Sequence, residues 1–403
     1  MNLVVTLDAR FERTPDGKVW SVSRCPYSFW QPYLDVFDQV KVVARIKNVD
    51  KTPEYFLESS GPRVTFIPMP YFIGVSQFLF KFFETKLLLK KNILATDAVL
   101  SRATNCFDSL IYPILKKRKQ PYGVQVVGNP YNAMSKDAYK SLFRPYLKYR
   151  LPKLLKSLCH DACAVTYVTR ETLQHSFPPS EKAFSNYFSN VRITPDAIID
   201  HPRQFRYFSK EQPARIISVG SLANLRKAPD ILIKAVAKGI SHGLFLHLSF
   251  AGGGQEEFGL RNLAISLGIE SHVEFLGDLP GVASVRQKMD QSDLFILPSR
   301  IEGLPRAMVE AMARALPCIG SEADGIPELL PEEWIVPVND VSALVNAMER
   351  MVTNPELMNK ESIRNLNEAV AHYHFDSLLM RQRDFLRHLK NITQEWVDRN
   401  QSE

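Results

Sequence analysis

The stretch SRIEGLPRAMVEAMARALPCIGS, residues 299–321, decides how the second half of this chain folds. An apolar strand leads into it, and the pattern predicts a short loop and then a helix that begins near Leu304 and ends after Ala315. Glu302 is therefore expected at an exposed helix N-terminus, with Glu310 about two turns further along. Because the first turn of a helix has unpaired N–H groups and favours anions, this arrangement suits a ligand with hydroxyls and phosphates.

A second strand and the run DGIPELL, residues 324–330, follow this helix. The two glutamates and this run resemble the nucleotide-sugar signature of the family-4 retaining glycosyltransferases of the GT-B fold. In that family the signature is E-x7-E followed by G-G-x-P-E. Asp324 stands where that pattern has its first glycine. Two glutamates at this spacing are, by themselves, more often solvated side chains of a surface helix, so the resemblance depends on the surrounding motifs.

Earlier segments extend the resemblance. A predicted buried strand, residues 215–220, precedes SLANLRKAPDILIKAVAKG, in which Lys227 matches a basic residue typical of the family. Arg226 lies beside it, and Ser221 replaces the family's common arginine after Gly220. The resemblance implies that Lys227, with Arg226, stabilises the departing diphosphate, because a fixed cation offsets the developing negative charge.

Glycines follow two further predicted strands. The strand at 244–251 ends in Gly252-Gly253-Gly254, and a short strand after it ends at Gly277. Glycines at such positions permit positive φ and close approach of the backbone to a ligand, although three glycines can also form a simple turn. In the resembled family the loop after the second of these strands reads the nucleotide base. The match of these pieces, in order, covers about residues 214–390.

The resemblance assigns a role to each group of residues. Glu310 is expected to bind the ribose, and Glu302 with the N–H groups of residues 303–305 is expected to hold the sugar hydroxyls and the diphosphate. The catalytic residues implied are Glu302, Lys227 and Arg226, and the donor-binding residues are Glu310, Gly303, Leu304, Pro305, Gly220, Ser221, Gly252, Gly253, Gly277 and Gly17. No metal and no cofactor beyond the nucleoside diphosphate sugar are expected, because basic side chains can replace the cation. A UDP-sugar is favoured over a GDP-sugar.

The first half of the chain alternates apolar strands with helices, as the second half does. Its expected strands are residues 2–7, 40–44, 64–68, 98–101, 122–127 and 163–168, and its expected helices include 27–37, 72–90 and 106–118. Such alternation predicts an α/β protein with two doubly wound, Rossmann-like domains that face each other across a cleft. We expect an acceptor-binding domain at 1–205, a donor-binding domain at 206–374 and a C-terminal helix at 375–403, which in GT-B proteins commonly crosses back to the first domain.

Two loops of the first half are expected to meet the substrates. RFERTPDGKVW contains Gly17, where the resembled sequences often have a Gly-Gly pair, and VVGNPYNAM offers Asn129, Tyr131 and Asn132 to the acceptor. The alternative for Asn129 is an ordinary turn. Asn cannot act as a general base, so the donor's own phosphate is expected to take the acceptor proton, as a front-face retaining mechanism requires. Weaker candidates for a base are Asp8, Glu12 and Asp16.

Charge is unevenly distributed along the chain. Residues 1–205 hold 29 Lys and Arg against 17 Asp and Glu, whereas residues 206–403 hold 21 against 26. Basic residues alternate with long apolar side chains at 78–92 and 144–158, as in helices that lie in membrane interfaces. Packing of Phe78, Phe82, Leu89 and similar side chains on the core is the alternative. We expect the first domain to face an anionic membrane surface and not nucleic acid.

Three further properties bear on the compartment. No apolar run reaches the ~18 residues that span a bilayer. The N-terminus is interpreted as a strand and not as a signal peptide. The five cysteines are scattered and odd in number, which argues against a disulfide framework and for a reducing environment. We therefore expect a cytoplasmic protein, associated peripherally with the inner face of the plasma membrane.

These observations predict a metal-independent, retaining hexosyltransferase of the bacterial polysaccharide type. It would move a hexose from a nucleoside diphosphate sugar to a lipid-linked or surface glycan. Two alternatives stay open: another GT-B enzyme, such as a sugar-nucleotide epimerase or a phosphorylase, or a basic nucleic-acid-binding protein with an inert sugar-nucleotide fold. The intact glutamate pair and Lys227 argue against the inert fold, and the basic segments contain no recognisable RNA module.

Overall fold

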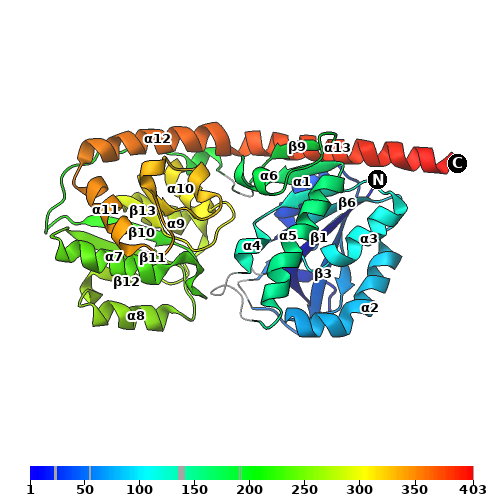
Figure 1. Ribbon diagram of the computed structural model, residues 1–403, viewed down its shortest axis with the longest axis horizontal. Coiled ribbons are helices and arrows are strands. Elements are labelled where there is room, and N and C mark those ends of the chain that lie inside the picture. The colour runs from blue at the N-terminus through cyan, green and yellow to red at the C-terminus, as the bar shows by residue number, and fades with distance from the viewer. Residues whose placement is uncertain (22–24, 54–55, 135–140, 190, 192, 403) are drawn as a thin grey trace. The chain divides into compact units, whose positions relative to one another are not determined.

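The computed structural model describes residues 1–21, 25–53, 56–134, 141–189, 191 and 193–402. Two compact units are present (Figure 1), of which unit 1 comprises Met1–Met134, Ser141–Phe188 and Leu379–Glu403 and unit 2 contains Ser189–Leu378. Each unit is built around a mainly parallel sheet with helices packed on it. The α/β fold predicted from the sequence is therefore confirmed.

The described residues of unit 1 form one sheet of nine strands. Its parallel part has the order β5–β3–β1–β6–β7–β8–β9, while β2 pairs antiparallel with β1 and with β4. The strands are β1 (Leu3–Arg13), β2 (Val19–Ser21), β3 (Val40–Asn48), β4 (Leu57–Glu58), β5 (Val64–Met69), β6 (Ala98–Ala103), β7 (Gly123–Val126), β8 (Ala164–Tyr167) and β9 (Phe184–Tyr187). Central strands such as β7 and β8 are buried at every position, because helices or loops cover both faces.

The helices of unit 1 follow the predicted alternation. They are η1 (Tyr27–Trp30), α1 (Gln31–Leu34), α2 (Gly74–Asn92), α3 (Asp108–Arg118), α4 (Pro130–Ala133), α5 (Arg144–Asp161), α6 (Thr172–Ser176) and most of α13 (Phe375–Gln401). The predicted helix at 27–37 is instead a 3-10 turn and a short α-helix that ends at Leu34. Within the described part of the chain, no helix is long and apolar enough to cross a membrane.

The first strand is longer than predicted. A bulge between Thr6 and Arg10 interrupts its pairing with β3, and the pairing then continues as far as Arg13. A tight turn follows, in which Gly17 has φ +84° and donates its N–H to the Thr14 carbonyl over 2.9 Å. The segment predicted as a loop is therefore mostly a β-hairpin, and its glycine is needed for the turn.

The last helix, α13, completes the core of unit 1. Phe385 and Leu389 are fully buried, and a Cβ atom at Gly123 of β7 would meet both side chains at 3.0–3.1 Å. At the same helix, Arg383 forms an ion pair with Asp35 over 2.7 Å. The C-terminal residues are thus packed directly on the sheet that begins at the N-terminus.

The described residues of unit 2 form a six-stranded parallel sheet of order β12–β11–β10–β13–β14–β15. The strands are β10 (Ala214–Val219), β11 (Leu246–Ala251), β12 (Val273–Phe275), β13 (Leu294–Leu297), β14 (Cys318–Ser321) and β15 (Ile335–Val336). The helices are η2 (Pro195–Ala197), η3 (Leu225–Lys227), α7 (Pro229–Ser241), α8 (Glu257–Ser266), η4 (Glu270–His272), α9 (Gly281–Asp290), α10 (Arg306–Ala313), η5 (Ile326–Glu328), η6 (Glu332–Trp334), α11 (Val341–Val352) and α12 (Pro355–Tyr373). The strand order reverses between β10 and β13, and ligands bind at such points in open parallel sheets.

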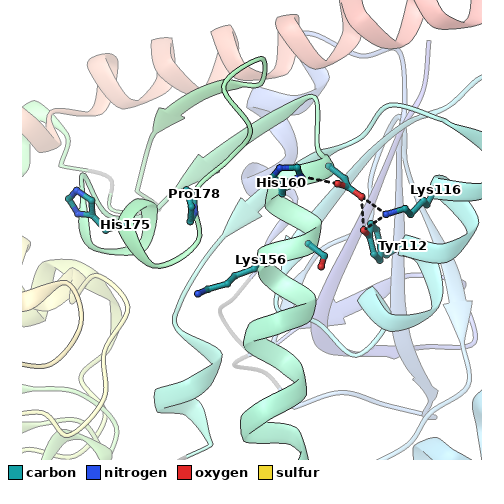
Figure 2. A pocket seen from close by; sticks show the side chains of 8 residues that line it. Tyr112, Lys116, Lys156, His160, His175 and Pro178 are labelled. Atoms are coloured by element: carbon teal, nitrogen blue, oxygen red, sulfur yellow. Dashed lines mark hydrogen bonds and ion pairs between the residues drawn. The ribbon is translucent and has the colours of Figure 1, made fainter.

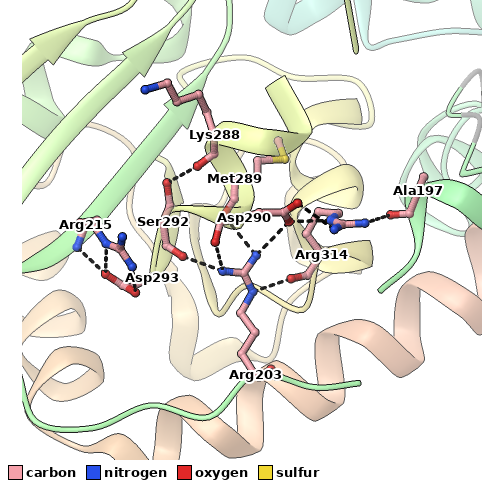
Figure 3. A network of polar contacts seen from close by, with 10 residues as sticks. Ala197, Arg203, Arg215, Lys288, Met289, Asp290, Ser292, Asp293 and Arg314 are labelled. Atoms are coloured by element: carbon pink, nitrogen blue, oxygen red, sulfur yellow. Dashed lines mark hydrogen bonds and ion pairs between the residues drawn. The ribbon is translucent and has the colours of Figure 1, made fainter. Parts of the chain in front are cut away.

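The segment before β10 packs on unit 2 through Arg203 (Figure 3). Its guanidinium donates to the carbonyls of Arg314 and Ser292, each over 2.7 Å, and to the carbonyl of Met289 over 3.1 Å. Arg314 in turn pairs with Asp290 over 2.7 Å. These bonds attach residue 203 to unit 2, whose main segment begins at Ser189, whereas the polar, Pro-containing composition predicts a division after residue 205.

Candidate functional site

Glu302 lies in the loop between β13 and α10. Its side chain is only 8% exposed, and its Oε1 atom accepts hydrogen bonds from Lys227 Nζ and, over 2.9 Å, from Ser299 Oγ. The helix begins at Arg306, with Pro305 as its N-cap residue, two residues later than predicted. The expectation of an exposed carboxylate at a helix end is therefore wrong, because the loop folds Glu302 inward against Lys227.

Three hydrogen bonds join the Glu302 loop to the loop after β14. Ser321 Oγ donates to the carbonyl of Ser299 over 2.5 Å, and the N–H of Glu302 donates to Asp324 Oδ2 over 3.0 Å. The N–H of Gly325 donates to the carbonyl of Gly303 over 2.9 Å. The position of Glu302 is thus fixed from both its backbone and its side chain.

Lys227 reaches Glu302 from the loop after β10. Its alkyl chain lies over Gly220, where a Cβ atom would come within 3.2 Å of Lys227 Cε. Asn224 accepts the N–H of Arg226 over 3.1 Å and caps the short turn that contains both basic residues. Lys227 is 30% exposed, whereas Arg226 lies on the surface. The structure therefore brings together Lys227 and Glu302, two of the three predicted catalytic residues.

A second ion pair, which we did not predict, holds the two loops together. Arg300 donates to both carboxylate oxygens of Asp230, each over 2.8 Å, and to the carbonyl of Leu225 over 2.5 Å. Its own N–H donates to the Arg226 carbonyl over 2.7 Å. Both side chains are less than one-fifth exposed. The only signal in the sequence is an opposite charge in each of two segments that follow neighbouring strands, Arg300 in the loop after β13 and Asp230 in the first turn of α7.

The predicted glycines of unit 2 allow close backbone contact between loops. A Cβ atom at Gly252, which has φ +134°, would lie 2.3 Å from the carbonyl oxygen of Gly220. Gly252 also donates its N–H to the Gly277 carbonyl over 2.8 Å, and Gly253 donates to Asp278 Oδ1 over 2.8 Å. The close approach to Gly220 accounts for Gly252 within the protein itself, whereas contact of Gly252, Gly253 and Gly277 with a ligand stays a prediction.

The remaining donor-binding residues have varied surroundings. Ser221 is exposed, and its Oγ accepts the Ala223 N–H over 3.2 Å. Leu304 is buried beside the N-cap of α10. Pro305 has no N–H and cannot donate to a diphosphate, so the predicted group of donors is wrong at this residue. The first-turn N–H groups of α10 belong to Arg306 and the residues after it.

Glu310 lies within α10 and is half-buried. Burial raises the pKa of its carboxyl group above the ordinary value, while the positive charges of Arg306 and Arg286 act in the opposite direction. A carboxylate that burial has partly removed from water is stabilised by a ligand that donates hydrogen bonds to it. This environment is compatible with the predicted contact to ribose hydroxyls.

The predicted acceptor residues are in unit 1. Asn129 caps α4 by accepting the Tyr131 N–H over 3.0 Å, as expected of a turn residue. The Tyr131 ring is half exposed and has Lys148 Nζ 4.1 Å from its centroid. Asn132 lies in the same short helix. Contact of these side chains with an acceptor stays a prediction.

Unit 1 also has a shallow pocket of about 440 Å³ between α3, α5 and the segment around Pro178 (Figure 2). In it, Asp161 accepts hydrogen bonds from Tyr112 over 2.6 Å and Lys116 over 2.8 Å. These bonds hold the pKa of the Asp161 carboxyl well below its usual range. The pocket is lined by Tyr112, Lys116, Lys156, Ser157, His160, Asp161, His175 and Pro178, none of which is a predicted site residue. Among the described residues, no group of three His, Cys, Asp or Glu is placed to hold a metal ion.

Comparison with known proteins identifies relatives of this chain. Residues 202–367 match the family model described as "Glycosyl transferases group 1". The chain is 25% identical to Protein CapJ of Staphylococcus aureus, over 92% of this chain and 91% of that protein. It is 34% identical to the putative colanic acid biosynthesis glycosyltransferase WcaL of Escherichia coli, over 34% of this chain and 35% of that protein.

A solved structure shows the same fold over almost the whole chain. Anabaena Alr3699/HepE, determined with UDP and glucose, has a TM-score of 0.62 and 14% identity, and the match covers 96% of this chain and 99% of that one. The family model covers most of unit 2, where Lys227 and Glu302 lie, and CapJ and HepE extend the likeness through unit 1. Residues 202–367 therefore resemble the group 1 glycosyl transferases, and the chain is a glycosyltransferase of the GT-B fold.

Proposed function

We propose that this protein is a retaining, metal-independent hexosyltransferase that uses a nucleoside diphosphate sugar, most readily a UDP-sugar, and a lipid-linked or surface glycan as acceptor. The observation that carries the proposal is the Lys227–Glu302 pair. It joins the loops that follow β10 and β13, which are neighbouring strands on either side of the reversal in strand order. A ligand at that point meets a cation and a carboxylate together.

The two side chains suit different parts of the donor. In the free protein they neutralise each other, and a bound donor would offer hydroxyls to the Glu302 carboxylate and a diphosphate to Lys227. Negative charge grows on the diphosphate as the glycosidic bond breaks, so a fixed ammonium stabilises the transition state more than the ground state. Lys227, with Arg226 beside it, would thus take the part of a metal ion.

The proton of the acceptor hydroxyl needs a base. The acceptor loop contains Asn129 and Asn132, whose neutral side-chain amides cannot act as a general base. We infer that the leaving diphosphate takes the proton on the same face of the sugar from which it departs. Attack from that face retains the configuration of the anomeric carbon.

Two of these similar proteins support the choice of substrates. The HepE structure contains UDP and glucose, which favours a UDP-sugar as donor. WcaL is described as a putative colanic acid biosynthesis glycosyltransferase, which favours a role in polysaccharide synthesis. The rival GT-B activities, epimerase and phosphorylase, would produce a free epimerised sugar or a sugar phosphate and no new glycosidic bond.

A screen of nucleotide sugars tests the proposal. A ligand at 100 times its dissociation constant adds ~2.7 kcal/mol to the stability of the folded protein, which a thermal shift detects readily. The donor that stabilises the protein is then incubated with lipid-linked glycan primers, and NMR of the product gives its anomeric configuration. An inverted product would refute the retaining mechanism, and a free epimer or sugar phosphate would favour the rival enzymes.

Glu310→Ala is expected to weaken binding of UDP roughly ten- to a hundredfold, because a lost hydrogen bond to a charged group costs ~1.5–3 kcal/mol. Calorimetry of the wild type and the variant with UDP measures the effect. The matched control is Glu270→Ala, which removes an exposed glutamate elsewhere in unit 2. Equal UDP affinity in all three proteins would show that Glu310 serves only the packing of α10.

The raised pKa of Glu310 also predicts a dependence of stability on pH. At pH values between the ordinary and the raised pKa, the Glu310 carboxyl is protonated more often in the folded protein than in the unfolded chain. The contribution of Glu310 to stability therefore falls as pH rises through that interval. Glu310→Gln, without ligand, is expected to have a higher Tm than the wild type at pH 7, with the difference disappearing below pH ~4, near the ordinary pKa. A Tm difference that is constant with pH would contradict this.

Membrane attachment is the second part of the proposal. Phe80, Phe83 and Leu87 of α2 are 89%, 81% and 68% exposed and lie on one face of the helix. Phe78 and Phe82 are half-buried and Leu89 is fully buried, as the core-packing alternative expected. The helix therefore has an inner face against the unit and a second apolar face towards solvent. We infer that the second face binds the inner leaflet of the plasma membrane from the cytoplasm.

The charges around this face fit an anionic surface. Lys81, Lys86, Lys90 and Lys91 of the same helix are exposed, and each surface lysine can contribute about 1 kcal/mol of attraction, screened by salt. Exposed Leu142, Phe143, Tyr146 and Tyr149 add a second apolar stretch at the start of α5. Apolar side chains among lysines are typical of peripheral membrane helices.

Flotation with liposomes separates the two contributions. The wild type is expected to float with anionic liposomes at low salt and less at high salt. Lys86→Glu with Lys90→Glu and Lys91→Glu should remove the salt-dependent part, and Phe80→Ser with Phe83→Ser the part that remains at high salt. Phe258→Ser, at an equally exposed phenylalanine of unit 2, is the matched control. A wild type that ignores anionic liposomes at low salt would make a soluble acceptor the better proposal.

A further inference from the structure

Asp324 has a backbone conformation that an aspartate adopts at a cost. Its φ is +44°, in the left-handed region that favours glycine, and the residue is only 8% exposed. It occupies the loop between β14 and η5, directly before Gly325. A glycine would adopt this φ without strain and would bury no carboxylate. The presence of aspartate here therefore calls for a compensating contact.

One such contact is with the backbone of Glu302. Asp324 Oδ2 accepts the Glu302 N–H over 3.0 Å, while the side chain of Glu302 binds Lys227 and Ser299. A carboxylate acceptor makes a stronger hydrogen bond than a neutral one. The adjacent bond from the Gly325 N–H to the Gly303 carbonyl, at 2.9 Å, joins the same two loops.

We propose that Asp324 is a positioning residue, which holds the Glu302 backbone so that the Glu302 carboxylate meets the donor sugar in a fixed place. The inference rests on the proposed function, since it takes Glu302 as the residue that binds the sugar. Asp324 acts through Glu302 and through the loop that contains it. The strained φ is retained because the residue that relieves it, glycine, has no acceptor for the Glu302 N–H.

This role predicts that stability and activity separate in two substitutions. Asp324→Gly removes the strain and the acceptor together, so the variant is expected to unfold at the same temperature as the wild type or higher, with kcat for hexose transfer reduced at least tenfold. Asp324→Asn keeps an acceptor oxygen in a side chain that tolerates left-handed backbone, so its kcat is expected to stay within about threefold of the wild type. The affinity for UDP alone should change much less than kcat in Asp324→Gly, because UDP lacks the sugar that Glu302 binds.

The matched control is Lys119→Gly, which relieves another left-handed residue, φ +53°, at the C-terminus of α3 in unit 1. It is expected to alter neither kcat nor the KM for the donor. The experiment measures Tm, UDP affinity, kcat and donor KM for the wild type and the three variants.

The outcomes are distinct. Asp324→Gly with wild-type kcat, or Asp324→Asn as impaired as Asp324→Gly, overturns the positioning role while the proposed function stands. A large fall in Tm with Asp324→Gly would show that the carboxylate serves the fold and would also overturn it. Absence of transfer by the wild type from every nucleotide sugar overturns the proposed function and this inference together.

Discussion

Replacing Glu302 with glutamine is expected to lower hexose transfer by at least a hundredfold. Glutamine has nearly the same shape, but it cannot neutralise Lys227 and is a weaker acceptor for sugar hydroxyls. Loss of one fixed electrostatic partner in an active site typically costs about 10²- to 10³-fold in kcat. The measurement is initial transfer rate at saturating donor.

The same substitution should leave the fold intact. Lys227 is 30% exposed, so its ammonium can be hydrated when its partner loses its charge, and Ser299 can still bond to the amide. A Tm within a few degrees of the wild type is therefore expected. Glu270→Gln, at an exposed glutamate of unit 2, is the control and should transfer normally. Turnover of Glu302→Gln within a few-fold of the wild type would remove Glu302 from the site.

Lys227→Ala is expected to reduce kcat by about 10²- to 10³-fold and to raise the KM for the donor much less, because the ammonium is most useful when charge builds up on the diphosphate. Kinetics at several donor concentrations separate the two constants. Lys227→Met is the matched variant, since it keeps an apolar chain over Gly220 and removes only the charge.

Arg226 provides the next comparison. It lies in the same turn as Lys227, so Arg226→Ala combined with Lys227→Ala shows whether the second cation substitutes for the first. A double variant much slower than Lys227→Ala would indicate that it does. If Lys227→Ala changes the donor KM and leaves kcat alone, Lys227 acts in the ground state and its catalytic role is wrong.

Periodic features of the sequence were sufficient to predict the fold. Each strand expected in the first half is present, because buried parallel strands such as residues 98–101 are apolar runs between helical segments. The end of β1 could not be predicted. Its continuation through Arg10 and Arg13 depends on pairing with Arg45 and Asn48 of β3, and a segment with several charged residues resembles a loop in the sequence.

The sequence predicts which residues form the candidate site but not how those residues contact one another. A local pattern identifies Glu302 and Lys227, but the burial of Glu302 results from contact with Lys227, 75 residues away in the chain. Arg300 is a comparable case, since its partner Asp230 is equally remote. In the sequence, Asp324 is distinguished only because it replaces the first glycine of the family pattern. Contacts between distant loops decide which charges meet, and periodicity contains no information about them.

The arrangement of unit 1 has a consequence for synthesis of the protein. Residues 1–188 leave the ribosome before α13, yet the sheet they form is completed by Phe385, Leu386 and Leu389 of that helix, all fully buried. A core that lacks these side chains exposes apolar surface and is marginal. Unit 2, contained in one continuous stretch of the described chain, can fold while unit 1 still waits for its final helix. The core of unit 1 can therefore be completed only after unit 2 has been synthesised, and a chain that stops short of α13 leaves its N-terminal unit unfinished for proteases to remove.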